Sequence, residues 1–274
     1  MMNVIAGMPR AGSTLLCNLL NQNPSFQATS TSILPGMIML MSQYWSNSLE
    51  IRGALINDRL ATEVRMRDTM LAIARAWYPT DKTVFDKGRQ WTGNLPLFFK
   101  VFPTGKVIIC LRDLREIVAS IEKQHLKNPI LNVAPGMNVR QRVSKMLAPK
   151  GMLRICLNGL RDILERKLDV YFLRAEELTR FPQQVMERLY AFLEEPTFEH
   201  TLEGVLNTAE DVDALYLHKY PHEGSGDIYP LEPSWQKYLS DGLASEITSA
   251  FPWYNEAFGY GGRKLRAIRH VPAA

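Results

Sequence analysis

Residues 7–14 read GMPRAGST, and this loop guides the interpretation of the whole chain. It follows a short apolar run with β-strand character at residues 3–7 and precedes a helical pattern at residues 13–21, in which the leucines share one face. Gly7 and Gly12 are five positions apart, as in the G-x-x-x-x-G spacing of phosphate-binding loops. Such a loop directs backbone N–H groups and the positive end of a helix dipole at an anion. The sequence therefore predicts a phosphate-like ligand at the end of the first strand.

The loop differs from that of nucleoside triphosphatases at one position. These enzymes place a lysine directly after the second glycine, where it reaches the β- and γ-phosphates, whereas this chain has Ser13 followed by Thr14. The positive charge lies inside the loop instead, at Arg10. Ordinary ATP or GTP hydrolysis is therefore disfavoured, and binding of another phosphate-like group is retained. A tight strand-to-helix turn without a ligand is the alternative.

The order of elements along the chain predicts an α/β fold. Further strand patterns lie at residues 26–29, 83–86, 106–111 and 169–173. Helical patterns lie between them at residues 55–77, 113–127, 139–166 and 182–193, with another run that ends at Phe102. Because the VIICL run at residues 107–111 is apolar throughout, we expect a strand that is buried on both faces of a parallel sheet. Residues 217–233 are rich in Gly, Pro and His and predict a long loop.

A second anion-binding element is predicted after the strand at residues 106–111. This strand ends at Arg112, and Ser120 follows eight positions later, inside the next helix. Ligands of open parallel sheets bind outside the carboxyl ends of the strands, so Arg112 lies at the correct edge to hold an anion. Arg112 could equally pair with Asp113 or Glu116. Together with the first loop, it suggests a ligand with phosphate-like groups at both ends.

Composition restricts the function without deciding it. The chain has 274 residues, enough for one large or two small domains, and a net charge of only +4, which does not indicate a nucleic-acid partner. No apolar run approaches the roughly 20 residues of a membrane helix. The three cysteines are far apart and odd in number, which is typical of a reducing cytoplasm and not of a disulfide framework or zinc site.

Four blocks of the sequence resemble sulfotransferases, in the order of that family. Residues 7–16 are similar to its 5′-phosphosulfate loop, and residues 111–120 to its 3′-phosphate motif. Residues 85–109 resemble the intervening segment, in which a lysine, here Lys87, follows a strand, and residues 174–193 resemble its R-Y-E-D-L…F-L region. The resemblance implies a P-loop NTPase-like three-layer sandwich with a mainly parallel sheet. It also implies one domain, residues 1–274, with a helical acceptor-side insertion at about residues 33–80.

The resemblance further implies a donor, 3′-phosphoadenosine 5′-phosphosulfate (PAPS), and a small-molecule or peptide acceptor, with no metal required. The residues implied to bind the donor are Arg10, Ala11, Gly12, Ser13, Thr14, Arg112, Ser120 and Lys219. Arg10 and Lys87 are implied to stabilise the charge that develops during transfer. A small-molecule kinase with a P-loop and a non-catalytic nucleotide-binding protein are the alternatives.

The general base of the reaction is left open by the sequence. The histidine of cytosolic sulfotransferases is replaced by Arg89, and the glutamate of tyrosylprotein sulfotransferases has no counterpart in residues 28–32. Asp86, next to Lys87, is one candidate. His218 is the other, because Leu-His-Lys at residues 217–219 resembles a Leu-Ser-Lys motif of the tyrosylprotein enzymes. Residues 33–45 and 55–77 are expected either to line the acceptor pocket or simply to cover the sheet.

Overall fold

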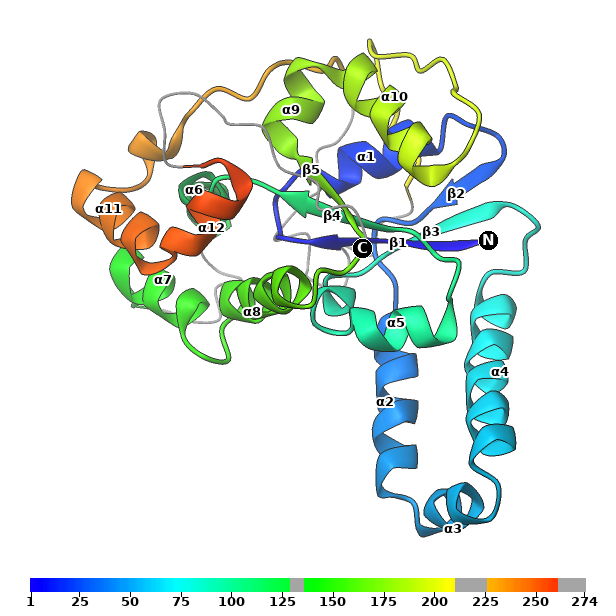
Figure 1. Ribbon diagram of the computed structural model, residues 1–274. Coiled ribbons are helices and arrows are strands. Elements are labelled where there is room, and N and C mark those ends of the chain that lie inside the picture. The colour runs from blue at the N-terminus through cyan, green and yellow to red at the C-terminus, as the bar shows by residue number, and fades with distance from the viewer. Residues whose placement is uncertain (129–135, 210–225, 261–274) are drawn as a thin grey trace.

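A five-stranded parallel sheet forms the centre of the computed structural model, which describes residues 1–128, 136–209 and 226–260 (Figure 1). The strands are β1 (Met2–Gly7), β2 (Phe26–Ala28), β3 (Thr83–Lys87), β4 (Val107–Leu111) and β5 (Tyr171–Arg174). Their order across the sheet is β2-β3-β1-β4-β5, and every neighbouring pair is parallel. All five strands lie where the sequence predicts them, so the α/β class with a parallel sheet is confirmed.

The helices cover both faces of the sheet. The α-helices are α1 (Ser13–Leu20), α2 (Leu34–Asn47), α3 (Leu49–Asn57), α4 (Arg59–Trp77), α5 (Leu95–Val101), α6 (Leu114–Lys127), α7 (Val139–Leu147), α8 (Met152–Glu165), α9 (Ala175–Arg180), α10 (Pro182–Leu193), α11 (Asp241–Ala250) and α12 (Pro252–Phe258). Two short 3-10 helices are η1 (Arg89–Gly93) and η4 (Trp235–Lys237). The helices up to α8 connect successive strands, and those from α9 onward follow β5. In Figure 1, α1, α9 and α10 lie above the sheet and α5 and α8 lie below it. The helices and sheet thus make three layers.

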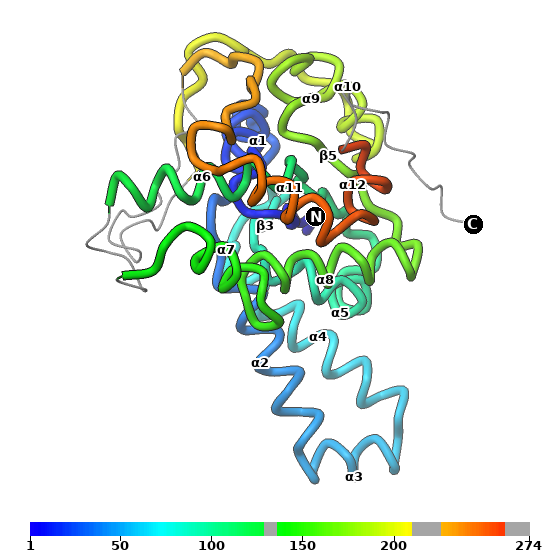
Figure 2. Tube along the Cα trace, turned by 90° about the vertical axis from the view of Figure 1, so that its left-hand side faces the viewer, coloured from blue at the N-terminus to red at the C-terminus, as the bar shows by residue number. Residues whose placement is uncertain are grey.

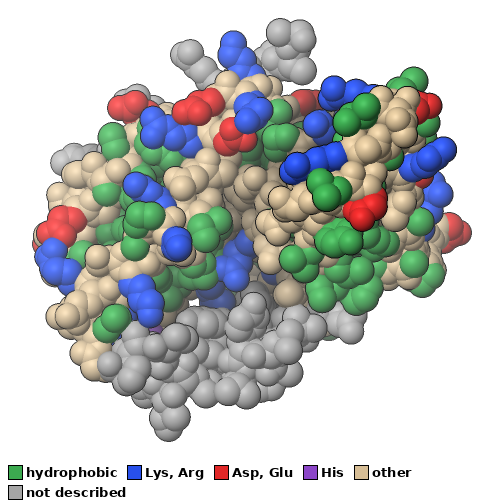
Figure 3. Space-filling model, turned by 90° about the horizontal axis from the view of Figure 1, so that it is seen from below, with side chains coloured by type: hydrophobic (Ala, Val, Ile, Leu, Met, Phe, Trp, Pro, Cys, Tyr) green, Lys and Arg blue, Asp and Glu red, His purple; other side chains and the backbone are tan. Residues whose placement is uncertain are grey.

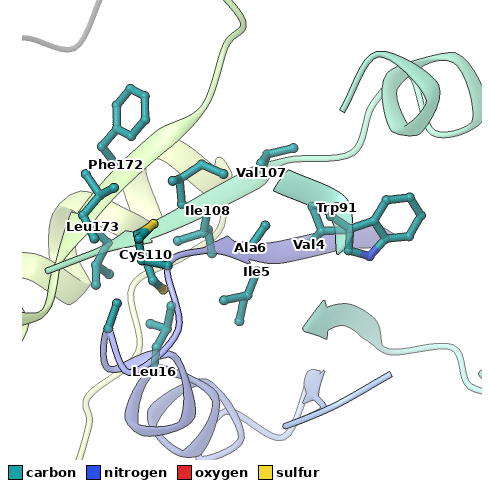
Figure 4. Close-up of a cluster of buried hydrophobic side chains, with 14 of the residues drawn as sticks. Val4, Ile5, Ala6, Leu16, Trp91, Val107, Ile108, Cys110, Phe172 and Leu173 are labelled. Atoms are coloured by element: carbon teal, nitrogen blue, oxygen red, sulfur yellow. The ribbon is translucent and has the colours of Figure 1, made fainter. Parts of the chain in front are cut away.

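The core lies between these layers. All five residues of β4 are buried, as expected for an apolar strand in the interior of a parallel sheet. Figure 4 shows side chains of β1, β4 and β5 packed together, with Leu16 of α1 directed at them. The thiols of Cys17, Cys110 and Cys156 are buried and unpaired. Burial is the main reason why the pKa of Cys17 is raised to about 12, so this thiol stays protonated.

Three helices form an arm that projects from the body. Figures 1 and 2 both show α2, α3 and α4 extending away from the sheet. No residue of α3 is buried, and Leu49, Ile56 and Leu60 are at least 75% exposed. Figure 3 looks onto the end of the arm, and hydrophobic side chains are gathered there, in the right-hand half of the view. Of the helices in the described part of the chain, none combines the length and the apolar content that crossing a bilayer requires.

Two of the predicted helices are divided in the structure. The single helix predicted at residues 55–77 is wrong, because Asp58 is extended and its carboxylate accepts the Ala61 N–H, which ends α3 and begins α4. The continuous helix predicted at residues 139–166 is also wrong. The chain turns at Gly151, where a Cβ atom would lie 2.2 Å from the carbonyl oxygen of Met146, and α8 begins after this turn. Of the predicted loop 217–233, only residues 226–233 are described, and they contain neither helix nor strand.

His200 makes the stability of this fold sensitive to acid. His200 is 6% exposed, and its ring lies 5.6 Å from the ring of Tyr190 and 5.1 Å from that of Phe198, measured between centroids. Burial lowers the pKa of His200 below its ordinary 6.5. The unfolded chain therefore binds a proton more readily than the folded one, so the stabilisation is complete above about pH 6.5 and is lost as the pH falls through the folded pKa.

Because His200 takes up its proton more readily in the unfolded chain, we expect the free energy of unfolding of the wild type to fall as the pH is lowered from about 6.5. The fall due to this residue should be at most about 1.4 kcal/mol per pH unit. Urea unfolding at pH 6.5 and 5.5 measures the fall, and His200→Gln, which cannot take up the proton, should show a smaller one. Equal falls in the two proteins would rule out His200 as the source.

Candidate functional site

The loop between β1 and α1 has a backbone suited to an anion. Gly7, Arg10 and Gly12 have φ angles of 107°, 58° and 77°, so the chain enters the left-handed region three times within six residues. Arg10 is not a glycine, and a side chain in this region costs about 1–2 kcal/mol. α1 then starts at Ser13, and its N-cap residue, Gly12, has no side chain to cap the first N–H groups. These N–H donors and the helix dipole together favour a negatively charged group at the loop.

Gly7 fixes where the loop begins. Gly7 is paired with Cys110 of the neighbouring strand β4, and the backbone N–H of Met8 donates to the Cys110 carbonyl at 2.8 Å. The Gly7 N–H donates to the hydroxyl of Thr92 at 2.8 Å. An added Cβ at Gly7 would lie 2.3 Å from the Cys110 carbonyl oxygen. Only glycine fits between the two strands at this point.

Lys87 lies beside the start of α1. It is the last residue of β3, and its ammonium group donates to the Thr14 hydroxyl at 3.0 Å. The structure therefore brings together Lys87 and the loop residues that the sequence predicted as one site. A cation and the N-terminus of a helix at the same place can both stabilise charge on a bound anion.

The two predicted anion elements meet through Arg10 and Arg112. The Arg10 Nε donates to the Ser120 hydroxyl of α6 at 3.0 Å. The Arg112 Nη1 donates to the backbone carbonyl of Arg10 at 3.1 Å. The side chain of Arg112 is 14% exposed, and its Nε is buried with no hydrogen-bond partner within the described part of the chain. A buried donor without a partner costs free energy, so Arg112 is held here at the expense of one unsatisfied N–H group.

Two glutamates organise the same region, Glu116 buried and Glu176 half-buried, and little in the sequence indicates their role. Glu116 accepts the backbone N–H groups of Ser234 at 2.7 Å and of Trp235 at 3.0 Å, and lies 3.5 Å from the Arg112 Nη2. It thereby holds a distant segment against α6, with Arg112 as a third partner. The Arg112–Glu116 pairing was one alternative that the sequence raised; the contact to Ser234 joins residues 118 positions apart, which no local pattern could indicate.

Glu176 holds the start of α6 in place. It accepts the backbone N–H of Asp113 at 3.1 Å and the hydroxyl of Tyr260 at 3.0 Å. Burial is the main reason why the pKa of Glu176 is raised. Because Tyr254 also donates to the Arg112 carbonyl, at 2.8 Å, the turn that carries Arg112 is fixed from two sides.

The remaining predicted residues are placed as follows. Ala11 is buried in the loop, and Ser13 is half-buried at the start of α1. Asp86 has no exposed surface, so its carboxylate cannot touch an acceptor directly. His218 and Lys219 lie outside the described residues. Within the described ranges, no group of three or more His, Cys, Asp or Glu side chains could hold a metal ion.

Comparisons with known proteins agree with this geometry. Residues 4–200 match the model of the Sulfotransferase family. A putative protein-tyrosine sulfotransferase of Caenorhabditis briggsae is 22% identical over 197 residues, which are 69% of this chain and 64% of that protein, so the match spans slightly less than two thirds of that relative.

Solved structures share the fold at low identity. The sulfotransferase STF9 of Mycobacterium avium aligns with a TM-score of 0.55 and 15% identity over 94% of this chain and 77% of its own. Mouse sulfotransferase SULT7A1, solved in complex with adenosine 3′,5′-bisphosphate (PAP), aligns with a TM-score of 0.54 and 13% identity over 93% of this chain and 84% of its own. These structures have the P-loop NTPase-like fold that the sequence predicted. Since the family model covers the sheet, the anion loop and the Arg112 turn, this chain belongs to the sulfotransferase family.

Proposed function

We propose that this protein is a sulfotransferase that moves the sulfuryl group of PAPS to a hydroxyl or amine acceptor. The observation that carries the proposal is the contact of Arg10 with Ser120 and of Arg112 with the Arg10 carbonyl, because it joins two anion-binding elements into one site. A donor with a phosphosulfate at one end and a 3′-phosphate at the other requires two anion-binding elements in one site. Family membership and the PAP complex of the mouse relative support the same donor.

The backbone amides of Ala11 to Thr14 and the ammonium of Lys87 would hold the phosphosulfate. The guanidinium of Arg112 and the Ser120 hydroxyl would hold the 3′-phosphate. Arg10 belongs with this second group in our proposal, since its Nε lies on Ser120 and not on the start of α1. Glu116 offsets part of the positive charge of Arg112, which keeps the site from attracting anions indiscriminately.

When bound, PAPS supplies the sulfuryl group and a leaving phosphate. Attack in line with the departing oxygen builds negative charge on the sulfuryl oxygens and on the leaving phosphate, by analogy with phosphoryl transfer. Lys87 and the N–H groups at the start of α1 are fixed donors at the place where we expect this charge. Donors that are already oriented need not reorganise during the reaction, and this is why they accelerate it.

We place the acceptor beside the base of the arm. The chain forms one domain in this proposal, and the insertion at about residues 33–80 contains α2, α3 and α4. Pro35, at the start of α2, packs so closely on Gly88 that a Cβ there would lie 2.8 Å from its Cγ. The base of the arm therefore adjoins the residue after Lys87, whereas α3 lies at the far end (Figure 1). Figure 3 shows a hollow beside the arm with Lys or Arg side chains in it, which would suit an acceptor entering from this side.

The expected acceptor is a small molecule or a peptide, and the proposal involves no nucleic acid, membrane or metal. We also infer a cytoplasmic location, since three buried free thiols fit a reducing compartment.

Thermal unfolding with added nucleotides tests the donor. Saturation of the site by adenosine 3′,5′-bisphosphate (PAP) at about 100 times its Kd should stabilise the protein by about 2.7 kcal/mol, or roughly 5–8 °C in Tm. ATP with Mg²⁺ at the same concentration should give a much smaller shift. Arg112→Ala should abolish the difference, whereas Arg115→Ala, which removes a neighbouring arginine paired with Asp113, should preserve it.

Equal shifts with PAP and ATP would contradict the proposal and favour a kinase. A PAP-specific shift without transfer of labelled sulfate from PAPS to any of a panel of phenols, alcohols and amines would favour the non-catalytic alternative.

A further inference from the structure

Asp86 is a buried carboxylate with an unusual set of partners. It lies on β3 immediately before Lys87 and is 0% exposed. Its Oδ2 accepts the indole N–H of Trp91 at 2.6 Å, and its Oδ1 accepts the hydroxyl of Tyr78 at 2.5 Å. Burial raises the pKa of Asp86, which makes this carboxylate a stronger base than an exposed one.

Tyr78 connects this carboxylate to a second hydroxyl. Its oxygen lies 3.2 Å from the Oγ of Ser32. A tyrosine has one hydroxyl proton, and the short contact assigns it to Asp86, so the Ser32 hydroxyl is left to donate to Tyr78 or to the nearby Asp86, whose pKa it lowers. The Ser32 Oγ also accepts the Leu34 N–H at 3.0 Å, which leaves it one further lone pair. Ser32 is half-buried, whereas Asp86 has no exposed surface, so the chain of hydrogen bonds runs from the interior to the surface.

The outer end of this chain lies at the edge of the sheet that carries the site. Ser32 follows β2, and Thr29, three residues before it, accepts the backbone N–H of Lys87 at 3.3 Å. The ammonium of the same lysine contacts Thr14 at 3.0 Å. The hydroxyl of Ser32 therefore emerges at the carboxyl ends of β2 and β3, as does the anion loop of the neighbouring β1.

We propose, building on the sulfotransferase function proposed above, that Ser32, Tyr78 and Asp86 form a relay that removes the proton from the acceptor. The acceptor hydroxyl gives its proton to Ser32, Ser32 gives its own to Tyr78, and Tyr78 gives its own to Asp86, which becomes neutral. The acceptor oxygen forms the new bond to sulfur as the bond between sulfur and the bridging phosphate oxygen breaks, and that electron pair stays on PAP. The relay is reset when Asp86 returns the proton to water through the same hydroxyls.

The relay explains how a family member without a histidine after the lysine can have a base. Ser32 is the group that touches the acceptor, and Tyr78 and Asp86 act through it. Among the described residues, the other charged or titratable groups next to Asp86 are Lys87 on its own strand and Cys17 on α1, whose raised pKa keeps it neutral. The hydrogen bonds that Tyr78 and Trp91 donate favour the ionised carboxylate before transfer, so the relay starts with a free base.

Replacement of either hydroxyl tests the relay. Ser32→Ala and Tyr78→Phe should each lower kcat for sulfate transfer from labelled PAPS to phenol at pH 7 by about 10²-fold or more, the usual contribution of a general base. PAP affinity, measured by calorimetry, should change less than twofold. Ser32→Thr retains the hydroxyl and should recover most of the rate. Thr31→Ala removes an exposed neighbouring hydroxyl and should behave as the wild type.

Comparison of acceptors separates a relay from a structural role. With 4-nitrophenol at pH 8, which is largely ionised and needs no base, the loss in both variants should shrink to a few fold. Where neither phenol is sulfated, release of labelled sulfate to water is measured in its place, since water also requires deprotonation. Rates within fivefold of the wild type, or equal losses with both phenols, would overturn the relay. Loss of the PAP shift in the wild type would instead overturn the sulfotransferase proposal.

Discussion

Gly7→Ala is expected to lower the free energy of unfolding by about 3–5 kcal/mol, the sum of a strained backbone angle and a steric clash. The φ angle of Gly7 is 107°, and the added Cβ would lie 2.3 Å from the carbonyl oxygen of Cys110 and 2.7 Å from its nitrogen. Both contacts are to the backbone of β4, which cannot move without breaking its pairing with β1. Because a domain is stable by only about 5–15 kcal/mol, the variant should be largely unfolded at moderate urea.

Gly12→Ala is the matched control for this experiment. Gly12 lies in the same loop with a φ of 77°, but among the described residues its added Cβ would meet Ala175 alone, at the ordinary contact distances of 3.4 Å to its Cβ and 3.7 Å to its Cα. Its cost should be the backbone strain alone, about 1–2 kcal/mol. Urea unfolding of both variants gives the comparison. If Gly7→Ala were no more destabilising than Gly12→Ala, the close approach of β1 and β4 would not be what requires glycine.

Lys87→Ala should lower kcat for sulfate transfer by about 10²–10³-fold, the loss observed when one oriented donor is removed from a developing anion. The ammonium of Lys87 lies at the Thr14 hydroxyl, so its charge is placed at the start of α1. The KM for PAPS should change much less, because the loop amides and Arg112 remain. Initial rates over a range of PAPS concentrations separate the two effects.

Lys82→Ala is the control for charge. Lys82 is an exposed lysine just before β3, at the opposite end of the strand, and its removal should leave kcat within twofold. A loss of less than fivefold in Lys87→Ala would show that this lysine serves the fold and not the reaction.

The sequence was sufficient for the sheet and for most of the donor site, because both depend on local patterns. The central strands β1 and β4 are short apolar runs, and the loop at residues 7–14 carries its spacing and its charge within eight residues. The family resemblance fixed the order of the blocks, and the family is confirmed. The sequence could also predict that Arg112 and Ser120 belong to one anion-binding element, because only one turn and part of one helix separate them.

The sequence could not predict what depends on contacts between distant residues. Asp86 is adjacent to Lys87 in the chain, but only the fold shows that Tyr78 and Trp91 enclose it. The direction of the Arg10 side chain is likewise set by Ser120, 110 positions away. Residues 55–77 were assigned one helix because Asp58 was not identified as an N-cap, although Asp is among the residues that favour this position.

The shape of the arm has a consequence for how this protein can change. Only Leu34, Pro35 and Ile38 of α2 are buried, all at the end next to the body, and α3 buries no residue. Local unfolding of this region therefore exposes little apolar surface and costs far less than global unfolding. Insertions, deletions or a grafted hairpin in α3 would leave the sheet and the donor site intact. The far end of the arm and the donor site can therefore change independently under evolution.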